Sequence, residues 1–256
     1  MASHEKDFPA IRACIFDMDG LLINSEDIIT LSTNRVLEKH GRPAFTQSIR
    51  AQLMGVPDST NGDVFHNWAK LPPLSGAEKM LFNLSRARSA SSGERIQLAL
   101  ASSTKTDTYK LKTYRPETKR LLDNFQADRR ILGDDPRVRQ GRGKPAPDIY
   151  LLALESINSV ACSGQRPIQP NECLVFEDSV AGVEAGSRTG MRVVWVPHQD
   201  VAAEYEAREK DVLAARSGMF GLGDDGQLGE TDDGWAESMS SLEHFDYKKY
   251  GINMPS

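Results

Sequence analysis

The chain has 256 residues, of which 39% are hydrophobic and 26% are charged. This composition is typical of a folded globular protein with one large domain, or a main domain and a smaller insertion. The formal net charge of −5 and the pI near 5.6 argue against a general nucleic-acid-binding protein.

No apolar segment approaches the roughly 20 residues that cross a bilayer, and residues 1–9 lack the apolar core of a secretory signal. Three cysteines without metal-ligand spacing indicate a reducing compartment. We therefore expect a cytoplasmic protein with no membrane or nucleic-acid partner.

Short apolar runs alternate with longer helical patterns along most of the chain. The predicted strands are Ile11–Phe16, Ile96–Ala101, Ile131–Gly133, Cys173–Phe176 and Arg192–Val196. The predicted helices of the same region are Ala77–Ala87, Thr106–Leu122, Pro147–Ser156 and Val180–Thr189. This alternation predicts an α/β fold, a doubly wound parallel sheet with helices on both faces.

The connection between Leu22 and Gly76 is too long for a single crossover helix. It contains three helical patterns, at Glu26–His40, Gln47–Leu53 and Gly62–Lys70, before Pro72-Pro73 blocks further helix. We interpret residues 23–75 as a small, shortened helical cap. Residues 1–22 and 76–256 then form the core and its C-terminal tail.

The tail after Pro197 differs from the core in composition. Val201–Arg216 has the pattern of an exposed helix, and Gly221–Gly234 is rich in Gly, Asp and Glu, which favours a loop. We expect four aromatic residues to anchor the terminus to the body: Trp235, Phe245, Tyr247 and Tyr250. The Arg- and Ser-rich stretch Ser85–Arg95 favours a solvated loop.

Polar groups follow several of the predicted strands directly. Asp17-Met18-Asp19-Gly20 ends the first strand, Ser102-Ser103 follows the second, and Glu177-Asp178 follows a later one, while Lys144-Pro145 opens a helical pattern. Ligands of such sheets collect beyond the carboxyl ends of the strands. Alone, each motif is more typical of a turn, a helix cap or a solvated loop. Together, in the order that one site requires, they favour a phosphoryl-transfer site.

The carboxylates are suited to attack on phosphorus assisted by a divalent cation. Asp17 is the expected nucleophile, a covalent strategy that divides one displacement into two easier steps. The side chain of Asp19 is the expected general acid and base. The expected Mg²⁺ ligands are Asp17, the carbonyl of Asp19, Asp178 and, directly or through water, Glu177.

A phosphate ester also needs positive charge and hydrogen-bond donors around its oxygens. Lys144 is expected to neutralise Asp17 and the transferring phosphoryl group. The backbone amides after Ser102 offer an anion-binding turn where the next helix begins. Gly20 is expected to allow a sharp turn after the acidic pair. The expected phosphate-binding residues are Ser102, Ser103 and Lys105, of which Lys105, like Thr104, is a secondary contact.

These motifs resemble the haloacid dehalogenase (HAD) superfamily of aspartate-dependent phosphatases. The resemblance spans about residues 11–197 and rests on four segments: Phe16–Leu22, Ala99–Ser103, Gly143–Pro145 and Val175–Gly186. It implies a doubly wound core, an inserted helical cap, Mg²⁺ dependence and the residue roles given above. Within the superfamily, Leu132–Pro136 and Gly190–Pro197 are most similar to the pseudouridine-5′-phosphatase-like branch.

The sequence departs from that superfamily at the cap. Asn24 stands where many relatives carry an aspartate, and the cap is shortened between Lys70 and Gly76. Because caps close the site and read the leaving group, this shortening bears directly on substrate choice.

Two alternatives to a Mg²⁺-dependent phosphomonoesterase acting on a small phosphate ester therefore stay open. One is a sugar phosphomutase using the same aspartyl-phosphate, and the other is a catalytically weak regulatory or binding protein. A dehalogenase is disfavoured because a departing halide needs no proton from Asp19. The sequence leaves the oligomeric state open.

Overall fold

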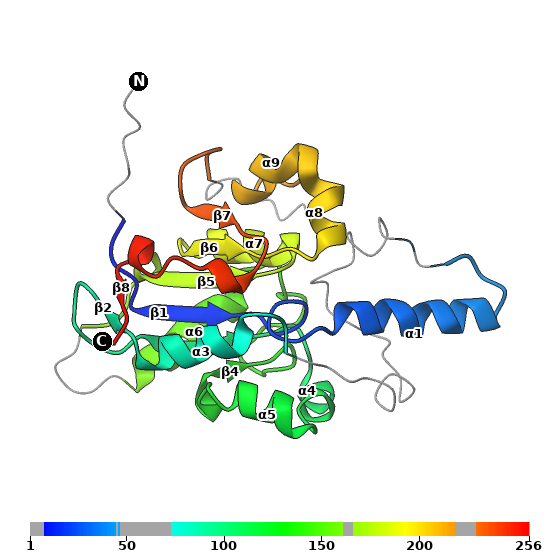
Figure 1. The fold of residues 1–256 in the computed structure, drawn as a ribbon, viewed down its shortest axis with the longest axis horizontal. Coiled ribbons are helices and arrows are strands. Elements are labelled where there is room, and N and C mark those ends of the chain that lie inside the picture. Colours follow the sequence, from blue (N-terminus) through cyan, green and yellow to red (C-terminus); the bar gives the residue numbers. More distant parts are fainter. Residues whose placement is uncertain (1–7, 45, 47–72, 161–165, 219–228, 256) are drawn as a thin grey trace.

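The computed structural model describes residues 8–44, 46, 73–160, 166–218 and 229–255, and its centre is a parallel β-sheet (Figure 1). Within the described residues this sheet has six strands in the order β4-β3-β1-β5-β6-β7, and every neighbouring pair is parallel. The strands are β1 (Ala13–Phe16), β3 (Gln97–Ala101), β4 (Arg130–Ile131), β5 (Cys173–Glu177), β6 (Arg192–Trp195) and β7 (Ala236–Ser238). The predicted doubly wound α/β fold is confirmed.

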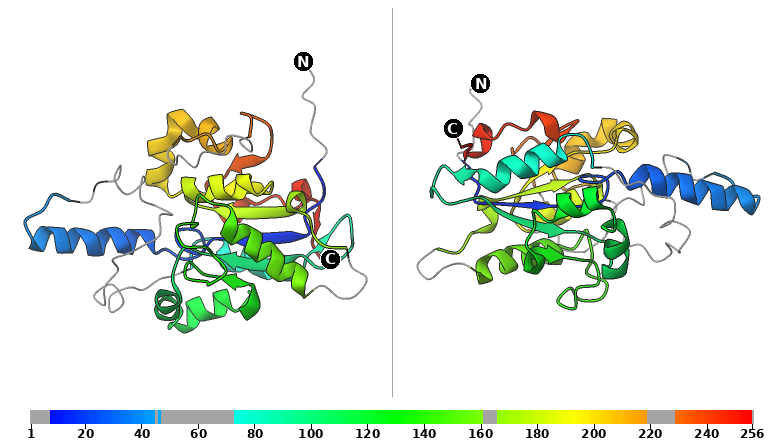
Figure 2. Two further views of the ribbon diagram at one scale, coloured as in Figure 1. Left: turned by 180° about the vertical axis from the view of Figure 1, so that it is seen from behind. Right: turned by 60° about the horizontal axis from the view of Figure 1, so that its bottom comes forward.

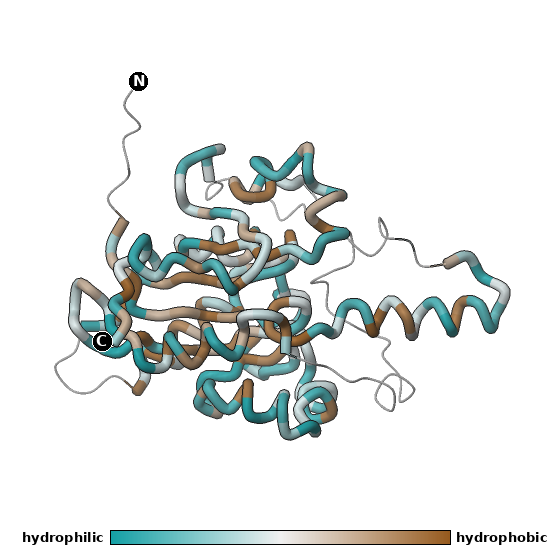
Figure 3. The backbone as a smooth tube through the Cα atoms, in the orientation of Figure 1, coloured by the Kyte–Doolittle hydropathy of each residue, from teal (hydrophilic) through white to brown (hydrophobic). Residues whose placement is uncertain are grey.

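Both faces of the sheet are buried, which explains why its strands are continuous apolar runs. Along β1, Ala13 and Ile15 belong to one hydrophobic cluster, whereas Cys14 and Phe16 belong to the other. The hydropathy of the backbone follows this arrangement, since the central strands are strongly apolar (Figure 3). Cys14 and Cys173 are fully buried, and burial raises the pKa of both thiols.

Helices cover the two faces of the sheet, as further views show (Figure 2). One cluster contains buried side chains of α6, α7, α8 and α9, and the other contains those of α3 and α5. The bounds of these helices are α3 (Ala77–Arg86), α5 (Pro116–Leu122), α6 (Asp148–Ser159), α7 (Val180–Arg188), α8 (Gln199–Tyr205) and α9 (Glu209–Leu213).

The first predicted helix of the cap is present as α1 (Glu26–Lys39), with His40 at its C-cap. It projects away from the sheet in Figures 1 and 2, and none of its side chains with a described exposure is buried. The other two predicted cap helices, Gln47–Leu53 and Gly62–Lys70, lie outside the described residues. The cap boundaries therefore stay a prediction.

Two helices that the sequence predicted as continuous are interrupted. The helix predicted over Thr106–Leu122 is instead α4 (Thr106–Lys112) and α5, because Pro116 keeps the preceding Arg115 in an extended conformation. In the tail, a 3₁₀ turn, η3 (Glu206–Arg208), separates α8 from α9. The expectation of an exposed tail helix is wrong in part, since Val201 and Tyr205 are buried.

The tail also contributes strands that the sequence analysis missed. Strand β7 extends the parallel sheet beside β6, and β8 (Ile252–Asn253) pairs antiparallel with β2 (Arg88–Ser89). The stretch Ser85–Arg95 is therefore not a simple solvated loop, since it includes β2 and the end of α3. The short 3₁₀ turns η5 (Leu242–His244) and η6 (Lys248–Tyr250) lie between β7 and β8.

The predicted aromatic anchor of the tail is confirmed. Phe245 and Tyr250 are buried, Tyr247 packs against the same cluster, and Trp235 lies edge-on to Phe8. Phe245 contacts Phe176 of β5 with ring centroids 5.2 Å apart. The tail is thus part of the core that supports β5.

Candidate active site

Parallel pairing brings together the residues that follow the central strands. Phe16 is in register with Leu100 of β3 and with Phe176 of β5, so Asp17 lies beside Glu177 at the same edge of the sheet. Lys144 reaches this edge from the loop that precedes α6. The predicted convergence of positions 17, 144 and 178 is therefore present.

Lys144 is the buried cation at the centre of this cluster. Its Nζ donates to Asp17 Oδ1 and to Glu177 Oε1, each at 2.5 Å, and to the carbonyl of Ala101 at 3.0 Å. Burial acts to lower the pKa of Lys144, but the two carboxylates outweigh it and raise that pKa. The ammonium is therefore charged, with its three hydrogens directed at fixed acceptors.

Glu177 is completely buried and serves mainly to hold other groups. Its Oε1 accepts from Lys144 and from the hydroxyl of Tyr150. Its Oε2 accepts from the Asp178 amide at 3.1 Å and from the amide and hydroxyl of Ser179 at 3.2 and 3.1 Å. A Cβ at Gly182 would overlap the Glu177 carboxylate, so glycine is required for this packing. Glu177 therefore orients Lys144 as well as adding negative charge.

Three buried carboxylates, those of Asp17, Glu177 and Asp178, have oxygen atoms within 4.8 Å of one another. Burial raises the pKa of Asp17 to about 7, with Lys144 opposing and Glu177 adding to the effect. Burial, followed by the charges of Glu177 and Asp17, raises the pKa of Asp178 well above its usual range. If all three were ionised, their negative charge would exceed the single positive charge of Lys144, which, together with burial, is why two of them hold protons more tightly than usual. Clustered oxygen ligands with excess negative charge fit a hard divalent cation such as Mg²⁺.

Asp19 points to a different set of partners. Its Oδ1 accepts from Lys112 Nζ at 2.7 Å, and its Oδ2 accepts from Thr104 Oγ1 at 2.5 Å. Burial acts to raise the pKa of Asp19, but Lys112 and Thr104 outweigh it and lower that pKa. Gly20 follows with φ +72° and lies against Asp178, which confirms the expected sharp turn.

The expected phosphate-binding residues occupy the turn between β3 and α4. Ser102 is buried and its Oγ accepts from the Thr104 amide at 3.2 Å. Ser103 is half-buried, whereas Lys105 is exposed at the N-cap of α4. Asp134 accepts from the amide and hydroxyl of Thr106 and so caps this helix from another loop.

Sequence reasoning missed three residues of the site: Lys112, Tyr150 and Gly182. Lys112 and Tyr150 lie inside helices, where a lysine or tyrosine is common and carries no motif. Gly182 is part of the segment used for the resemblance, but its contact with Glu177 depends on the fold.

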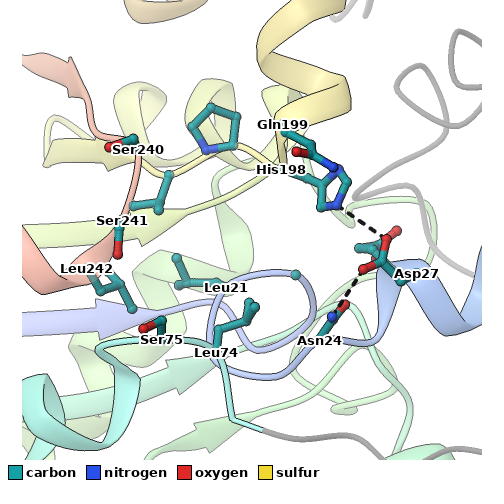
Figure 4. A pocket seen from close by; sticks show the side chains of 14 residues that line it. Leu21, Asn24, Asp27, Leu74, Ser75, His198, Gln199, Ser240, Ser241 and Leu242 are labelled. Atoms are coloured by element: carbon teal, nitrogen blue, oxygen red, sulfur yellow. Dashed lines mark hydrogen bonds and ion pairs between the residues drawn. The ribbon is translucent and has the colours of Figure 1, made fainter.

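A pocket of about 300 Å³ adjoins the Asp19-Gly20 turn (Figure 4). It lies between the start of α1 and the loops that follow β6 and β7. Asp27 of α1 lies 3.3 Å from His198 Nε2 and accepts from Asn24 Nδ2 at 3.1 Å. The root of the predicted cap is thereby tied to the core.

The comparisons with known proteins agree with this geometry. The model of the haloacid dehalogenase-like hydrolase family matches residues 14–196. The chain belongs to this family. The haloacid dehalogenase-like hydrolase core thus extends from β1 to the end of β6, and the three missed site residues lie inside it.

Two curated relatives and one solved structure illustrate what this hydrolase is similar to. A Saccharomyces cerevisiae protein named a probable pseudouridine-5′-phosphatase is 34% identical over 95% of this chain and 98% of its own length. An Arabidopsis thaliana (DL)-glycerol-3-phosphatase is 32% identical over 75% of this chain and 85% of its own length. The crystal structure of CbbY from Rhodobacter sphaeroides with phosphate has a TM-score of 0.57 at 18% identity, covering 91% and 96% of the two chains. The similarity to CbbY supports the fold.

Within the described residues, no helix is both long and apolar enough to cross a membrane.

Proposed function

We propose that this hydrolase is a Mg²⁺-dependent phosphomonoesterase acting on a small phosphorylated metabolite, a nucleoside or sugar phosphate. The observation that carries the proposal is the contact of one buried ammonium, Lys144, with Asp17 and Glu177 beside Asp178. An anionic nucleophile can approach an anionic ester only where fixed positive charge offsets their repulsion.

In the proposed reaction, a carboxylate oxygen of Asp17 attacks phosphorus and the bond to the leaving oxygen breaks. The negative charge of the bound ester acts to raise the pKa of Asp19, and Asp19 in its protonated form gives its proton to that oxygen, which leaves an aspartyl-phosphate on Asp17. The Asp19 carboxylate then takes a proton from the water that cleaves this intermediate, restoring Asp17. Lys144 stays charged throughout and stabilises the phosphoryl oxygens, and the Ser102 turn adds donors.

The residues that would hold Mg²⁺ are Asp17, the carbonyl of Asp19, Asp178 and Glu177. A Mg²⁺ ion held by these residues would supply positive charge to offset the negative charge of the phosphate oxygens. The bonds that Glu177 already makes to Lys144, Tyr150 and Ser179 favour contact with the ion through water.

The direct test is Asp17→Asn, assayed for phosphate release from p-nitrophenyl phosphate with Mg²⁺. We expect activity to fall to background because an amide cannot form the covalent intermediate. Asp107→Asn on α4 is the matched control, since its side chain is 93% exposed. Substantial activity of Asp17→Asn would contradict the mechanism.

The substrate requires a wider assay. The names of the relatives point to a nucleoside phosphate and to glycerol phosphate, so pseudouridine 5′-phosphate, glycerol 3-phosphate and a panel of sugar phosphates form the first set. We expect phosphate release from at least one member of this set. Isomerised sugar phosphate without free phosphate would favour a mutase, and negligible turnover of every compound would favour a binding protein.

A further inference from the structure

A second polar cavity, of about 520 Å³, lies at the opposite end of the sheet from the carboxylate cluster. Arg12 directly precedes β1, Gln97 opens β3, and Arg129 directly precedes β4, so these lining residues mark the amino ends of the strands. Arg12 and Asp17 stand five residues apart across β1, about 16 Å in an extended strand. The cavity is therefore separate from the candidate active site.

Arginine dominates the charge of this cavity. Five arginines line it, whereas Glu94 is the one carboxylate among its described lining residues. Glu172 accepts from Arg166 Nη1 and Nη2 at 2.7 and 2.6 Å. Even with Glu94 and Glu172 both ionised, the five arginines leave an excess of three positive charges, although the whole chain has a net charge of −5. The lining arginines are Arg12, Arg88, Arg95, Arg129 and Arg166.

Two of these arginines are buried and have N–H groups for which no described residue provides a hydrogen-bond acceptor. Arg12 is 5% exposed, and its Nη2 donates to Glu94 at 2.7 Å and to the carbonyl of Arg166 at 3.2 Å. Its Nε and Nη1 have no hydrogen-bond acceptor, although Nη1 lies 3.6 Å from Glu172. Buried guanidinium groups are costly unless their donors and their charge are both satisfied.

Arg129 repeats this pattern on the other side of the cavity. It is 7% exposed, its Nη1 donates to Gln97 at 2.7 Å, and its Nε has no acceptor among the described residues. Burial lowers the pKa of Arg129, with Asp128 opposing, as expected for a cation that is short of counter-charge. Both arginines line the cavity, so an anion bound there would add counter-charge beside two buried cations.

The remaining wall is apolar, formed by Ile157, Val160 and Ile168. The planar guanidinium group of arginine can form two parallel hydrogen bonds to phosphate oxygens. An apolar wall beside such groups suits a flat organic group. We propose that this cavity binds a nucleoside di- or triphosphate, with its phosphates on the arginines and its base against the apolar wall.

The test uses calorimetric titration of the full chain with ATP in EDTA at low salt, which suppresses turnover at the carboxylate cluster. We expect wild-type protein to bind ATP, and the double variant Arg88→Ala/Arg95→Ala to bind about tenfold more weakly or worse, because hydrogen bonds to charged groups are the strong ones. Both side chains are exposed, so the variant should keep its fold. The unliganded melting temperature should not fall, because removing mutually repelling cations costs little.

The matched control is Arg115→Ala/Arg120→Ala, which removes two exposed arginines on or beside α5. It should bind ATP like wild type and show that net charge alone is not responsible. Hydrogen exchange should show ATP-dependent protection of residues 88–97 and 129–131. Protection confined to residues 17–20 and 177–179, or equal ATP affinity in both double variants, would overturn the proposal.

Pyrophosphate and adenosine test the phosphate part and the nucleoside part of the proposed ligand separately. We expect pyrophosphate to bind more weakly than ATP and to lose its binding in Arg88→Ala/Arg95→Ala. Adenosine, which has no phosphate, should show no measurable binding. ATP that binds no more tightly than pyrophosphate would overturn the assignment to a nucleotide, and no binding of ATP at millimolar concentration would overturn the site.

Discussion

Two carboxylates that are separated by one residue have opposite electrostatic surroundings. Asp17 shares its space with Glu177, and burial raises its pKa to about 7, whereas Lys112 and Thr104 outweigh burial at Asp19 and lower its pKa. Divergent pKa values in one site are typical of carboxylates with different chemical roles. The sequence predicted two roles for the pair, but without a metal ion the shifts run opposite to those roles, because the expected nucleophile holds a proton more readily than the expected acid. A divalent cation bound beside Asp17 would lower the pKa of Asp17 and favour its ionised form.

The raised pKa of Asp17 predicts a pH-dependent stability in the protein without metal. Between the ordinary carboxyl pKa of 3.8 and about 7, the folded protein holds a proton that the unfolded chain releases. The contribution of Asp17 to stability should therefore fall as pH rises through this window, by about 1.4 kcal/mol per pH unit at most. Asp17→Asn cannot titrate and should lack this slope.

Thermal unfolding in EDTA from pH 4 to 8 measures this difference. We expect the stability of Asp17→Asn relative to wild type to increase towards pH 8, and the control Asp107→Asn to follow wild type. Parallel curves for Asp17→Asn and wild type would show that the Asp17 pKa is not raised by folding.

At the scale of elements, α4 brings together parts of the candidate site that the sequence separates. The turn before it carries Ser102 and Thr104, Asp134 caps its first turn, and Lys112 in its last turn reaches Asp19. The break before Pro116 ends the helix immediately after Lys112. Helix α4 therefore connects the expected phosphate-binding turn to the expected acid and base.

Loss of the Lys112 ammonium should misplace Asp19 without removing the nucleophile. We expect Lys112→Met to lower kcat by roughly 10- to 100-fold, part of what general acid-base catalysis contributes, and to leave KM within a few-fold of wild type. Methionine suits this position because Lys112 is buried. Steady-state kinetics on p-nitrophenyl phosphate with Mg²⁺ measure kcat and KM separately.

Lys110→Met is the control, because Lys110 lies on the same helix with its side chain 70% exposed. It should match wild type in kcat and KM. A Lys112→Met enzyme with unchanged kcat would show that Asp19 needs no partner on α4. Partial recovery of kcat by Lys112→Arg would support the role of the positive charge.

Local runs of apolar residues predicted the central strands of the sheet. The apolar runs ending at Phe16, Ala101 and Phe176 are strands within one or two residues, because buried parallel strands are apolar on both faces. Strands β7 and β8 could not be predicted in this way, since they are short and pair with distant segments. The contact of Lys112 with Asp19 likewise spans 93 residues, and it arises from packing of α4 rather than from any motif.

On the scale of the whole molecule, the sheet separates two sites of opposite charge. The carboxylate cluster lies at the carboxyl ends of β1 and β5, and the arginine-lined cavity lies at the amino ends of β1 and β3. The tail contacts both regions, because Phe245 packs on Phe176 next to Glu177, and β8 pairs with β2, which carries Arg88. The tail therefore stabilises the frame on which both sites depend.

Because the tail packs on the core, we expect a mutation in it to lower the stability of the protein strongly, although it lies far in sequence from the reacting groups. Phe245 is 6% exposed, and its ring lies 5.2 Å from Phe176 and 5.1 Å from Tyr250 between centroids. Phe245→Ala should lower the free energy of unfolding by about 3–5 kcal/mol, as large-to-small changes in a packed core do. Denaturant unfolding measures the loss.

Phe82→Ala is the matched control, because Phe82 is 57% exposed on α3 and its loss should cost under about 1 kcal/mol. Equal losses in the two variants would mean that the tail lies on the core without stabilising it.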